Sequence, residues 1–311
     1  EFAAGLYQIY YQFPIRLLRE MLKAKKTNYA SVPVYLTTFY REGVRYKQKF
    51  RNLTEAVFKI YKPSPLLLHS QDHVKLLKMS RIVDSQEQDT LIAKMSAGID
   101  ACLQLDIVKN LPDFLLPDDQ GSVYSYASCD MTVIDNRLVN VISFRQNKGI
   151  KEPLYCGELY IDAENNALVQ ARLEINPAYV RQATDMFIER KTRKWKITAQ
   201  KVVYTISYRQ WNGIYYMNHI RGDLYFKVKP KRQWFSASSL HTWFEMVTCK
   251  VDTDNVTRFQ RKERIPTRTI FSDTHFKYDA DFWGEFNVIP WEEELSTVIE
   301  KLSSKIEQIE Y

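Results

Sequence analysis

Residues 202–228 read VVYTISYRQWNGIYYMNHIRGDLYFKV, and this stretch decides how the chain is organised. Before the turn, the even positions are apolar or aromatic: Val202, Tyr204, Ile206 and Tyr208. The odd positions are smaller or more polar: Val203, Thr205, Ser207 and Arg209. A period of two predicts a β-strand with one dry face and one wet face. Asn212-Gly213 predicts a tight hairpin turn, because both residues tolerate positive φ.

The same alternation continues after the turn. On the second strand, the even positions are Ile214, Tyr216, Ile220, Leu224, Phe226 and Val228, and the odd positions include His219, Arg221, Asp223, Lys227 and Lys229. A third strand sets Leu240, Thr242, Phe244 and Met246 against His241, Glu245 and Cys249. The sequence therefore predicts three long antiparallel strands over residues 197–251, in a large curved meander with one face covered.

Working outward from these strands, we predict a single α+β domain over residues 1–311. Strands from 30–62 and 123–276 are expected to join one strongly curved antiparallel sheet of half-barrel type, because there are too few βαβ units for a parallel sheet. Residues 63–122 are expected to form a helical and loop insertion. The helices expected to cover the apolar face of the sheet are 5–26, which Pro14 divides, 86–109 and 290–309.

The C-terminal helix has the clearest helical pattern. Pro290 stands at its start, and the glutamates that follow suit the positive end of the helix dipole. Its apolar stripe is formed by Leu295, Val298, Ile299, Leu302 and Ile306. Because such a stripe needs a dry partner, Phe282, Trp283 and this helix are expected to be an integral lid on the sheet.

The charge of the chain is unevenly spread. The formal net charge is +7, yet residues 181–232 carry thirteen Lys/Arg and three Asp/Glu, and residues 279–311 carry two and nine. A solvated sheet face opposite an acidic tail helix accounts for this pattern. A surface for anionic lipid, polysaccharide or nucleic acid stays open, with nucleic acid disfavoured because no nucleic-acid-binding motif accompanies the charge.

A search for chemical motifs finds no nucleophile elbow, phosphate-binding loop, dinucleotide fingerprint or EF-hand. His69 and His73 have the spacing of a helical metal pair, but Ser70 stands where a metalloprotease has glutamate, and prolines favour a loop. Asp118-Asp119 is expected to solvate a loop. Three tryptophans would suit a sugar-binding surface only if they were exposed together in one groove: Trp211, Trp234 and Trp283.

A charged pair in the first strand and the four cysteines are expected to have structural roles. Arg41 and Glu42 are neighbours and therefore lie on opposite faces of a strand, so a buried Arg41 paired across the sheet is expected rather than a catalytic one. The four cysteines, Cys102, Cys129, Cys156 and Cys249, lie far apart in sequence without a CxxC motif. Cys129 and Cys156 are candidates for neighbouring strands, but free thiols explain them equally well.

Four segments together resemble one protein family: VYLTTFYRE at 34–42, LDIVKN at 105–110, GELYID at 157–162 and DFWGEFNVI at 281–289. They are similar to the C-terminal region of Bacteroidetes proteins called carboxypeptidase-like regulatory domain-containing proteins. That resemblance implies an exported protein and no peptidase activity. In the family, a signal peptide and a small β-sandwich precede this region, so the chain is expected to be a piece of a longer protein. The hairpin at 159–174 also resembles strands of periplasmic lipoprotein carriers, whose curved half-barrel is filled by helices.

We therefore predict a non-enzymatic exported module, in the periplasm or at the outer membrane, that binds an apolar ligand, a lipid or a protein partner. A hydrolase acting on cell-surface glycan or peptide stays open, as does a structural adaptor without a small-molecule ligand. No catalytic, metal-binding, cofactor-binding or ligand-binding residue is assigned. No cofactor and no nucleic acid are expected, and no apolar run approaches the roughly 20 residues of a membrane span. A deep apolar cavity would favour a carrier, and a polar cleft with paired carboxylates or a Ser/His pair would favour an enzyme.

Overall fold

The structure is a computed structural model. It describes residues 2–64, 70–83, 98–117, 123–188, 195–231, 237–268 and 306–307.

The three long strands predicted from the sequence are present. They are β9 (Trp195–Trp211), β10 (Ile214–Pro230) and β11 (Ser238–Asp252), and they pair antiparallel in chain order. Asn212 and Gly213 form the turn between β9 and β10 with φ of 50° and 83°. Both lie in the left-handed region, which Asn and Gly enter at low cost, so the predicted hairpin is confirmed.

A β-bulge changes the dry face of β10. The register against β9 shifts between Met217 and His219. Before the shift the buried residues are Tyr215 and Met217, whereas Ile214 and Tyr216, expected on the dry face, are half-buried. One extra residue moves every side chain beyond it to the other face, which is why the simple alternation was wrong there. Thr248 Oγ1 of β11 donates to the Met217 carbonyl at 2.6 Å and satisfies it beside the bulge.

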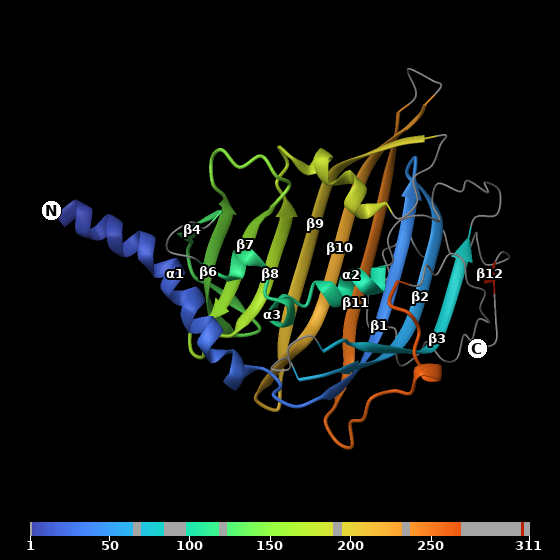
Figure 1. Ribbon diagram of the computed structural model, residues 1–311, viewed down its shortest axis with the longest axis horizontal. Coiled ribbons are helices and arrows are strands. Elements are labelled where there is room, and N and C mark those ends of the chain that lie inside the picture. Colours follow the sequence, from blue (N-terminus) through green and yellow to red (C-terminus); the bar gives the residue numbers. More distant parts are fainter. Residues whose placement is uncertain are drawn as a thin grey trace.

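All the described strands belong to one antiparallel sheet of twelve strands (Figure 1). Its order is β12-β3-β2-β1-β11-β10-β9-β8-β7-β6-β4, with β5 beside β6. The remaining bounds are β1 Val34–Tyr46, β2 Lys49–Lys62, β3 His73–Val83, β4 Tyr124–Ser128, β5 Thr132–Ile134, β6 Arg137–Gln146, β7 Tyr155–Asp162, β8 Leu168–Ile175 and β12 Ile306–Glu307. The sheet is open, with β4 and β12 at its two ends, so the predicted α+β half-barrel class is confirmed.

The pairing of β1 with β11 joins the N-terminal hairpin to the meander. As predicted, strands from 30–62 and from the region after residue 123 therefore share one sheet. The meander ends at Asp252. Among the described residues from 253 to 268, the regular structure is an isolated bridge, from Ile265 to Val74 of β3, and the short 3-10 helix η4 (Arg261–Glu263).

Strand β3 corrects the expected insertion over 63–122. The prolines there favoured a loop, but His73–Val83 pairs along β2, from Tyr61 opposite His73 to Asn52 opposite Val83. Val74 and Met79 are buried. The open edge of β2 offers a full row of backbone donors and acceptors, and pairing with it stabilises a strand whose own sequence is only weakly alternating.

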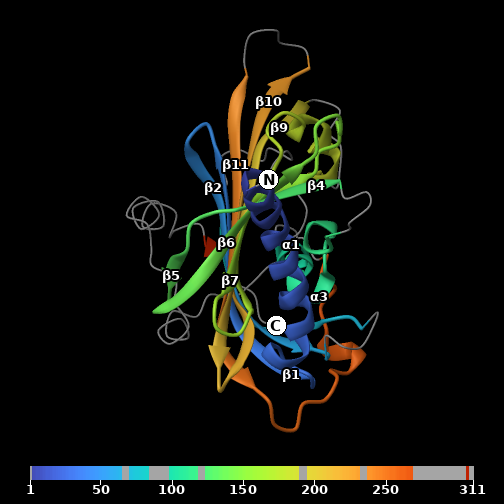
Figure 2. The ribbon, with the colours of Figure 1, turned by 90° about the vertical axis from the view of Figure 1, so that its left-hand side faces the viewer.

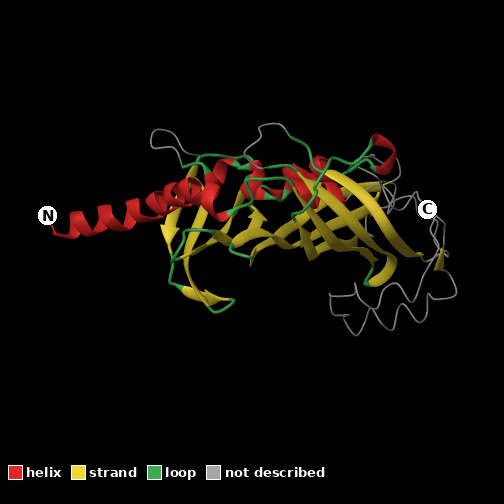
Figure 3. Cartoon of the chain, turned by 90° about the horizontal axis from the view of Figure 1, so that it is seen from below, coloured by secondary structure: helices red, strands yellow, loops and turns green. Residues whose placement is uncertain are grey.

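The helices lie on one face of the sheet (Figures 2 and 3). Helix α1 (Phe2–Asn28) runs continuously through Pro14, so the predicted division there was wrong. Its first turns extend past the edge formed by β4 (Figure 1). The helix expected over 86–109 is described from residue 98 and is two short helices, α2 (Gly98–Gln104) and α3 (Ile107–Asn110). The short 3-10 helices η2 (Asp113–Leu115) and η3 (Val180–Phe187) complete this layer.

The expected helix over 290–309 lies outside the described residues, as do Phe282 and Trp283, except for Ile306–Glu307. Those two residues form β12, which pairs with Ile82 and Arg81 of β3, and not the end of a helix. The described helices include none that is both long and apolar enough to cross a membrane.

One hydrophobic core fills the space between the sheet and the helices. Fully buried members come from helices and strands alike: Leu18, Leu36, Phe58, Ile99, Cys102, Phe114, Leu159, Ile206 and Ile220. Burying each such side chain stabilises the fold by about 1.5–3 kcal/mol. The core therefore holds the α2–α3 segment against the middle of the sheet, where the candidate site is found.

Candidate functional site

A small pocket lies where the chain leaves α1 and passes under α3. Its volume is about 50 Å³. The apolar part of its lining is Ala30, Val32, Val34, Leu36, Val108 and Met217. Val32 is 56% exposed, so the pocket reaches the surface beside this residue. The space equals one or two water molecules, at about 30 Å³ each. Lys62, Asp106 and Lys109 also line the pocket, so its apolar lining, which favours hydrocarbon over water, adjoins a charged side.

Tyrosines form the rigid wall of the pocket. The ring of Tyr29 meets that of Tyr208 edge-on, with centroids 5.7 Å apart. Tyr29 Oη donates to the Leu168 carbonyl at 2.7 Å, and Tyr215 Oη donates to Asp162 at 3.2 Å. Burial raises the pKa of Tyr29 and Tyr208 well above the ordinary value, so both are neutral hydrogen-bond donors at physiological pH.

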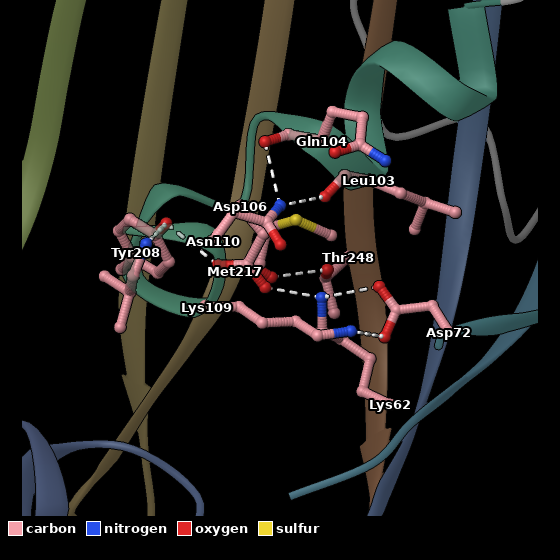
Figure 4. Close-up of polar contacts among 11 residues, drawn as sticks. Lys62, Asp72, Leu103, Gln104, Asp106, Lys109, Asn110, Tyr208, Met217 and Thr248 are labelled. Atoms are coloured by element: carbon pink, nitrogen blue, oxygen red, sulfur yellow. Dashed lines mark hydrogen bonds and ion pairs between the residues drawn. The ribbon is translucent and has the colours of Figure 1, made fainter. Parts of the chain in front are cut away.

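A buried cluster of charges adjoins the pocket (Figure 4). Lys62, the last residue of β2, donates to Asp106 Oδ2 at 2.5 Å and to Asp72 Oδ2 at 3.3 Å. Lys109 of α3 donates to Asp72 Oδ1 at 2.7 Å. The order Lys109–Asp72–Lys62–Asp106 alternates in sign and is neutral as a whole, which is how ionised side chains are tolerated away from water.

Asp106 lies at the centre of this arrangement. It accepts from Lys62 and, at 3.0 Å, from Tyr208 Oη of β9, which in turn accepts from the Val108 amide at 3.1 Å. Burial by itself would raise the pKa of Asp106, but the charge of Lys62 and the bonds from Lys62 and Tyr208 outweigh burial and lower it. Burial likewise acts to lower the pKa of Lys62, and the two carboxylates more than offset it, so this pKa is raised. Both groups are therefore ionised at neutral pH.

The segment LDIVKN, 105–110, owes its shape to two polar side chains. Asp106 separates α2 from α3 and binds the sheet, whereas Asn110 turns back and donates to the carbonyls of Leu103 and Gln104 at 3.1 and 2.9 Å. These bonds satisfy carbonyls at the end of α2 that lack helical partners. An Asp between Leu105 and Ile107 in an apolar run was the sequence signal for a buried charge, but its partners Lys62 and Asp72 had no such signal.

Both carboxylates of this cluster, those of Asp72 and Asp106, accept hydrogen bonds from lysine side chains, so neither is a free acid or base for catalysis. The geometry of the cluster instead ties the α2–α3 segment to β2 and β9 at a single point. We call this cluster the latch, formed by Lys62, Asp72, Asp106, Lys109 and Tyr208.

The residues considered as metal or sugar ligands do not come together. His73 lies in β3, stacked on the ring of Tyr61 at 5.4 Å, and its Nε2 is 3.0 Å from Arg264 Nη1. Trp211 is half exposed at the tip of the β9–β10 hairpin. His69, Asp118, Asp119, Trp234 and Trp283 lie outside the described residues. The part of the chain that the structure describes holds no group of three or more His, Cys, Asp or Glu placed to bind a metal.

The expected buried arginine is confirmed. Arg41 is 1% exposed, and its Nε donates to Glu55 Oε1 of β2 at 2.8 Å. On its other side Arg41 is in register with Glu245 of β11, which accepts from Arg221 Nη1 of β10 at 2.5 Å. Charges of alternating sign thus cross four strands on the face opposite the helices, and opposite charges in register stabilise neighbouring strands.

The same face brings a serine and a histidine together. Ser207 of β9 is in register with His219 of β10, whose Nε2 lies 3.8 Å from Glu245 Oε1. However, Ser207 Oγ is bonded to Asn218 at 3.4 Å, and Glu245 is engaged by Arg221. Among the described residues these three side chains do not form the linked nucleophile, base and acid that serine hydrolysis requires.

The four cysteines are free thiols. Cys102, a residue of α2, is buried, Cys129 is exposed, and Cys156 and Cys249 are half-buried. Burial raises the pKa of Cys102 well above its ordinary value, which makes this thiol unreactive.

A scan against protein-family models found no match, and a search of the curated proteins found none either. Similar solved structures include an outer membrane lipoprotein-sorting protein domain from Vibrio parahaemolyticus, with 8% identity, a TM-score of 0.29 and coverage of 78% of this chain and 93% of that one. A DUF1329 family protein from Desulfovibrio piger has 9% identity, a TM-score of 0.30 and coverage of 80% and 97%. A LolA superfamily protein from Nitrosomonas europaea has 9% identity, a TM-score of 0.24 and coverage of 77% and 94%. The resemblance to carboxypeptidase-like regulatory proteins thus has no counterpart in these comparisons, whereas one lipoprotein-sorting protein domain is among the similar structures.

Proposed function

We propose that this chain is a non-enzymatic binding module that holds an apolar chain between its sheet and its helices. The observation that carries the proposal is the apolar pocket beside Val34, Leu36 and Met217, which opens to the surface at Val32. The apolar part of this lining favours hydrocarbon over water, although the charged Lys62, Asp106 and Lys109 line the same pocket.

The pocket must enlarge to hold such a ligand. At about 50 Å³ it is far below the roughly 300–1,000 Å³ of ordinary ligand sites. The element that limits it is the α2–α3 segment, because Val108 of α3 lines the pocket and Asp106 fixes this segment to the sheet. Beneath the segment lie apolar residues of the core, so lifting it would extend the pocket over an apolar floor.

The latch is suited to hold an α2–α3 segment that moves away from the sheet and returns to it as one unit. Its charges are neutral as a group, so the closed state is stable, while its contacts with the sheet are confined to the end of β2 and to Tyr208. Binding of an acyl chain would replace the contacts that the apolar face of the segment makes with the core. We place the module outside the cytoplasm, in the periplasm or at the outer-membrane surface, on the support of the sequence resemblance to exported proteins.

The test is binding of a fluorescent fatty-acid probe, together with native mass spectrometry of the purified chain for retained lipid. Met217→Trp fills the pocket, and Val133→Trp, on a side chain that is 62% exposed on β5, is the matched control. We expect wild type and the control to bind the probe and Met217→Trp to lose binding while keeping its circular dichroism spectrum.

Two results would contradict the proposal: equal probe binding by Met217→Trp and wild type, or a wild-type chain that retains no lipid and binds no probe. The second result would favour a structural adaptor without a small-molecule ligand. Hydrolysis of a glycan or peptide substrate that is lost on Ser207→Ala or His219→Ala would favour the hydrolase alternative.

A further inference from the structure

Lys25, in the last turn of α1, is a half-buried cation beside the pocket. The Tyr29 amide donates to the Lys25 carbonyl at 3.1 Å, so the two residues are one helical turn apart on the same side of the chain. Tyr29 lines the pocket. The charge of Asp106, which also lines the pocket, acts on Lys25 as well. Lys25 therefore lies next to the pocket, within electrostatic reach of its charged side.

The charge of Lys25 is not compensated. Among the described residues Lys25 forms no ion pair, and Asp106 is already bonded to Lys62 and Tyr208. Burial lowers the pKa of Lys25, and the attraction of Asp106 does not offset this effect. The latch pairs two lysines with two carboxylates, so Lys25 is a surplus cation beside it. A charge that is partly removed from water without a counterion costs free energy, which a ligand with a negative charge would offset.

The neighbouring lysines of α1 are in a different position. Lys26 is exposed. The side chain of Lys23 is 72% exposed and donates to Glu20 at 2.8 Å. Both side chains keep most of their contact with water, so neither requires a ligand. Of these three lysines, Lys25 is the one that combines burial with the lack of a carboxylate among the described residues.

We propose that the pocket takes a single acyl chain with an anionic headgroup, whose carboxylate or phosphate pairs with Lys25 while the chain extends past Val34 and Met217. This ligand class rests on the proposed function, which it makes more specific. An ammonium group and an anionic oxygen form a charge-assisted hydrogen bond, roughly twice as strong as a neutral one. A neutral chain would leave Lys25 uncompensated, and a cationic chain would add repulsion. Lys62 and Lys109 are poorer partners for the headgroup, because each already donates to a carboxylate of the latch.

The experiment compares dodecyl chains that differ in their headgroup: dodecanoic acid, dodecyl phosphate, dodecanol and dodecylamine. Isothermal calorimetry measures the binding of each compound to the whole chain at neutral pH, below its critical micelle concentration. We expect wild type to bind the acid and the phosphate about tenfold more tightly than the alcohol, and the amine most weakly. Preference for the acid over the phosphate would indicate a fatty acid as the source of the anion, and the reverse preference a phospholipid headgroup.

The test variant is Lys25→Met, which keeps most of the length of the side chain and removes its charge. Lys26→Met is the matched control, because it removes the same charge from the exposed neighbour. In Lys25→Met the acid should bind about tenfold more weakly than in wild type, whereas the affinity for the alcohol should be unchanged. Because this variant loses a half-buried charge without a counterion, it should melt at or above the wild-type temperature.

Two kinds of failure are distinguishable. If wild type binds the acid and the alcohol equally, the pocket holds an apolar chain without selecting its headgroup, and only the headgroup assignment is overturned. The assignment is also overturned if Lys25→Met and Lys26→Met lose equal affinity for the acid, or if Lys25→Met melts below wild type, which would show that Lys25 is compensated in the ligand-free fold. If wild type binds none of the four compounds, the proposed function fails and the headgroup assignment fails with it.

Discussion

Lys62 and Asp106 are separated by 44 residues in the chain, yet Lys62 Nζ lies 2.5 Å from Asp106 Oδ2 at a buried site. This bond joins the end of β2 to the residue that separates α2 from α3. The position of the α2–α3 segment over the sheet therefore depends on this buried ion pair.

Asp106→Asn should strongly destabilise the chain. The substitution leaves Lys62 buried with Asp72 as its one carboxylate partner in this cluster, and it replaces one of the two oxygens that accept from Lys62 and Tyr208 with an NH2 group, which cannot accept. Breaking a buried ion pair costs about 3–5 kcal/mol, because the remaining charge has lost its compensation. Urea unfolding followed by fluorescence measures the loss, and hydrogen exchange should show faster opening of residues 98–115.

The double variant Lys62→Met with Asp106→Leu is the control for Asp106→Asn. It removes both charges together, and replacing a buried pair by apolar residues is often neutral or stabilising. The double variant should therefore be more stable than Asp106→Asn. If the urea midpoint of Asp106→Asn equals that of wild type, the latch does not hold the α2–α3 segment on the sheet.

Arg41→Met should destabilise the sheet more than Glu55→Gln does. Burial raises the pKa of Glu55 while Arg41 acts to lower it, so loss of Arg41 leaves a buried carboxyl that must take up a proton or be unpaired. Glu55→Gln leaves Arg41 in register with Glu245 on the other side. Urea midpoints of the two variants give the order, and equal or reversed midpoints would show that Glu245 rather than Glu55 is the main partner.

Stability should fall as the pH drops from about 4 to about 2, partly through Asp223. Burial alone would raise the pKa of Asp223, but hydrogen bonds from His241 and Arg221 outweigh it and lower the pKa to about 2. A carboxyl with a lowered folded-state pKa contributes stability that is complete above its unfolded pKa and lost as pH falls through the folded one. Asp223→Asn should be less stable than wild type at pH 7, and the difference should shrink by pH 2.5 in urea titrations. A constant difference at both pH values would contradict this assignment.

Gly157→Ala should weaken the pairing of β7 with β8. A Cβ built on Gly157 would lie 1.9 Å from the Arg172 carbonyl oxygen, a backbone atom that can move only if the strands separate. Overpacking of this kind costs about 1–3 kcal/mol or more. Gly149→Ala is the matched control, because Gly149 has φ of 97° but no atom within 4 Å of its Cβ position. Both variants should lower the melting temperature, but only Gly157→Ala should speed hydrogen exchange along β7 and β8.

Much of the fold could be predicted because it depends on neighbours in sequence. Alternation in β9 and β11 and the Asn212-Gly213 turn are local, since strand period and turn geometry depend on a few adjacent residues. The buried Arg41 could also be predicted, because a charged residue on the dense apolar pattern of β1 needs a partner. The candidate site could not, since Asp106 is ordinary until Lys62 and Tyr208 are placed beside it.

By itself, the sequence determined that residues 30–62 and the region after residue 123 hold strands, where the long hairpin turns, and that one antiparallel sheet would have a dry face covered by helices. Only the tertiary structure decided that β1 pairs with β11, that His73–Val83 is a strand on the edge of β2, and that a bulge at Asn218 exchanges the faces of β10. The physical reason is that alternation tells which side of a strand is dry but not which strand lies beside it. That choice depends on the free energy of contacts between residues about 200 positions apart, such as Arg41 and Glu245.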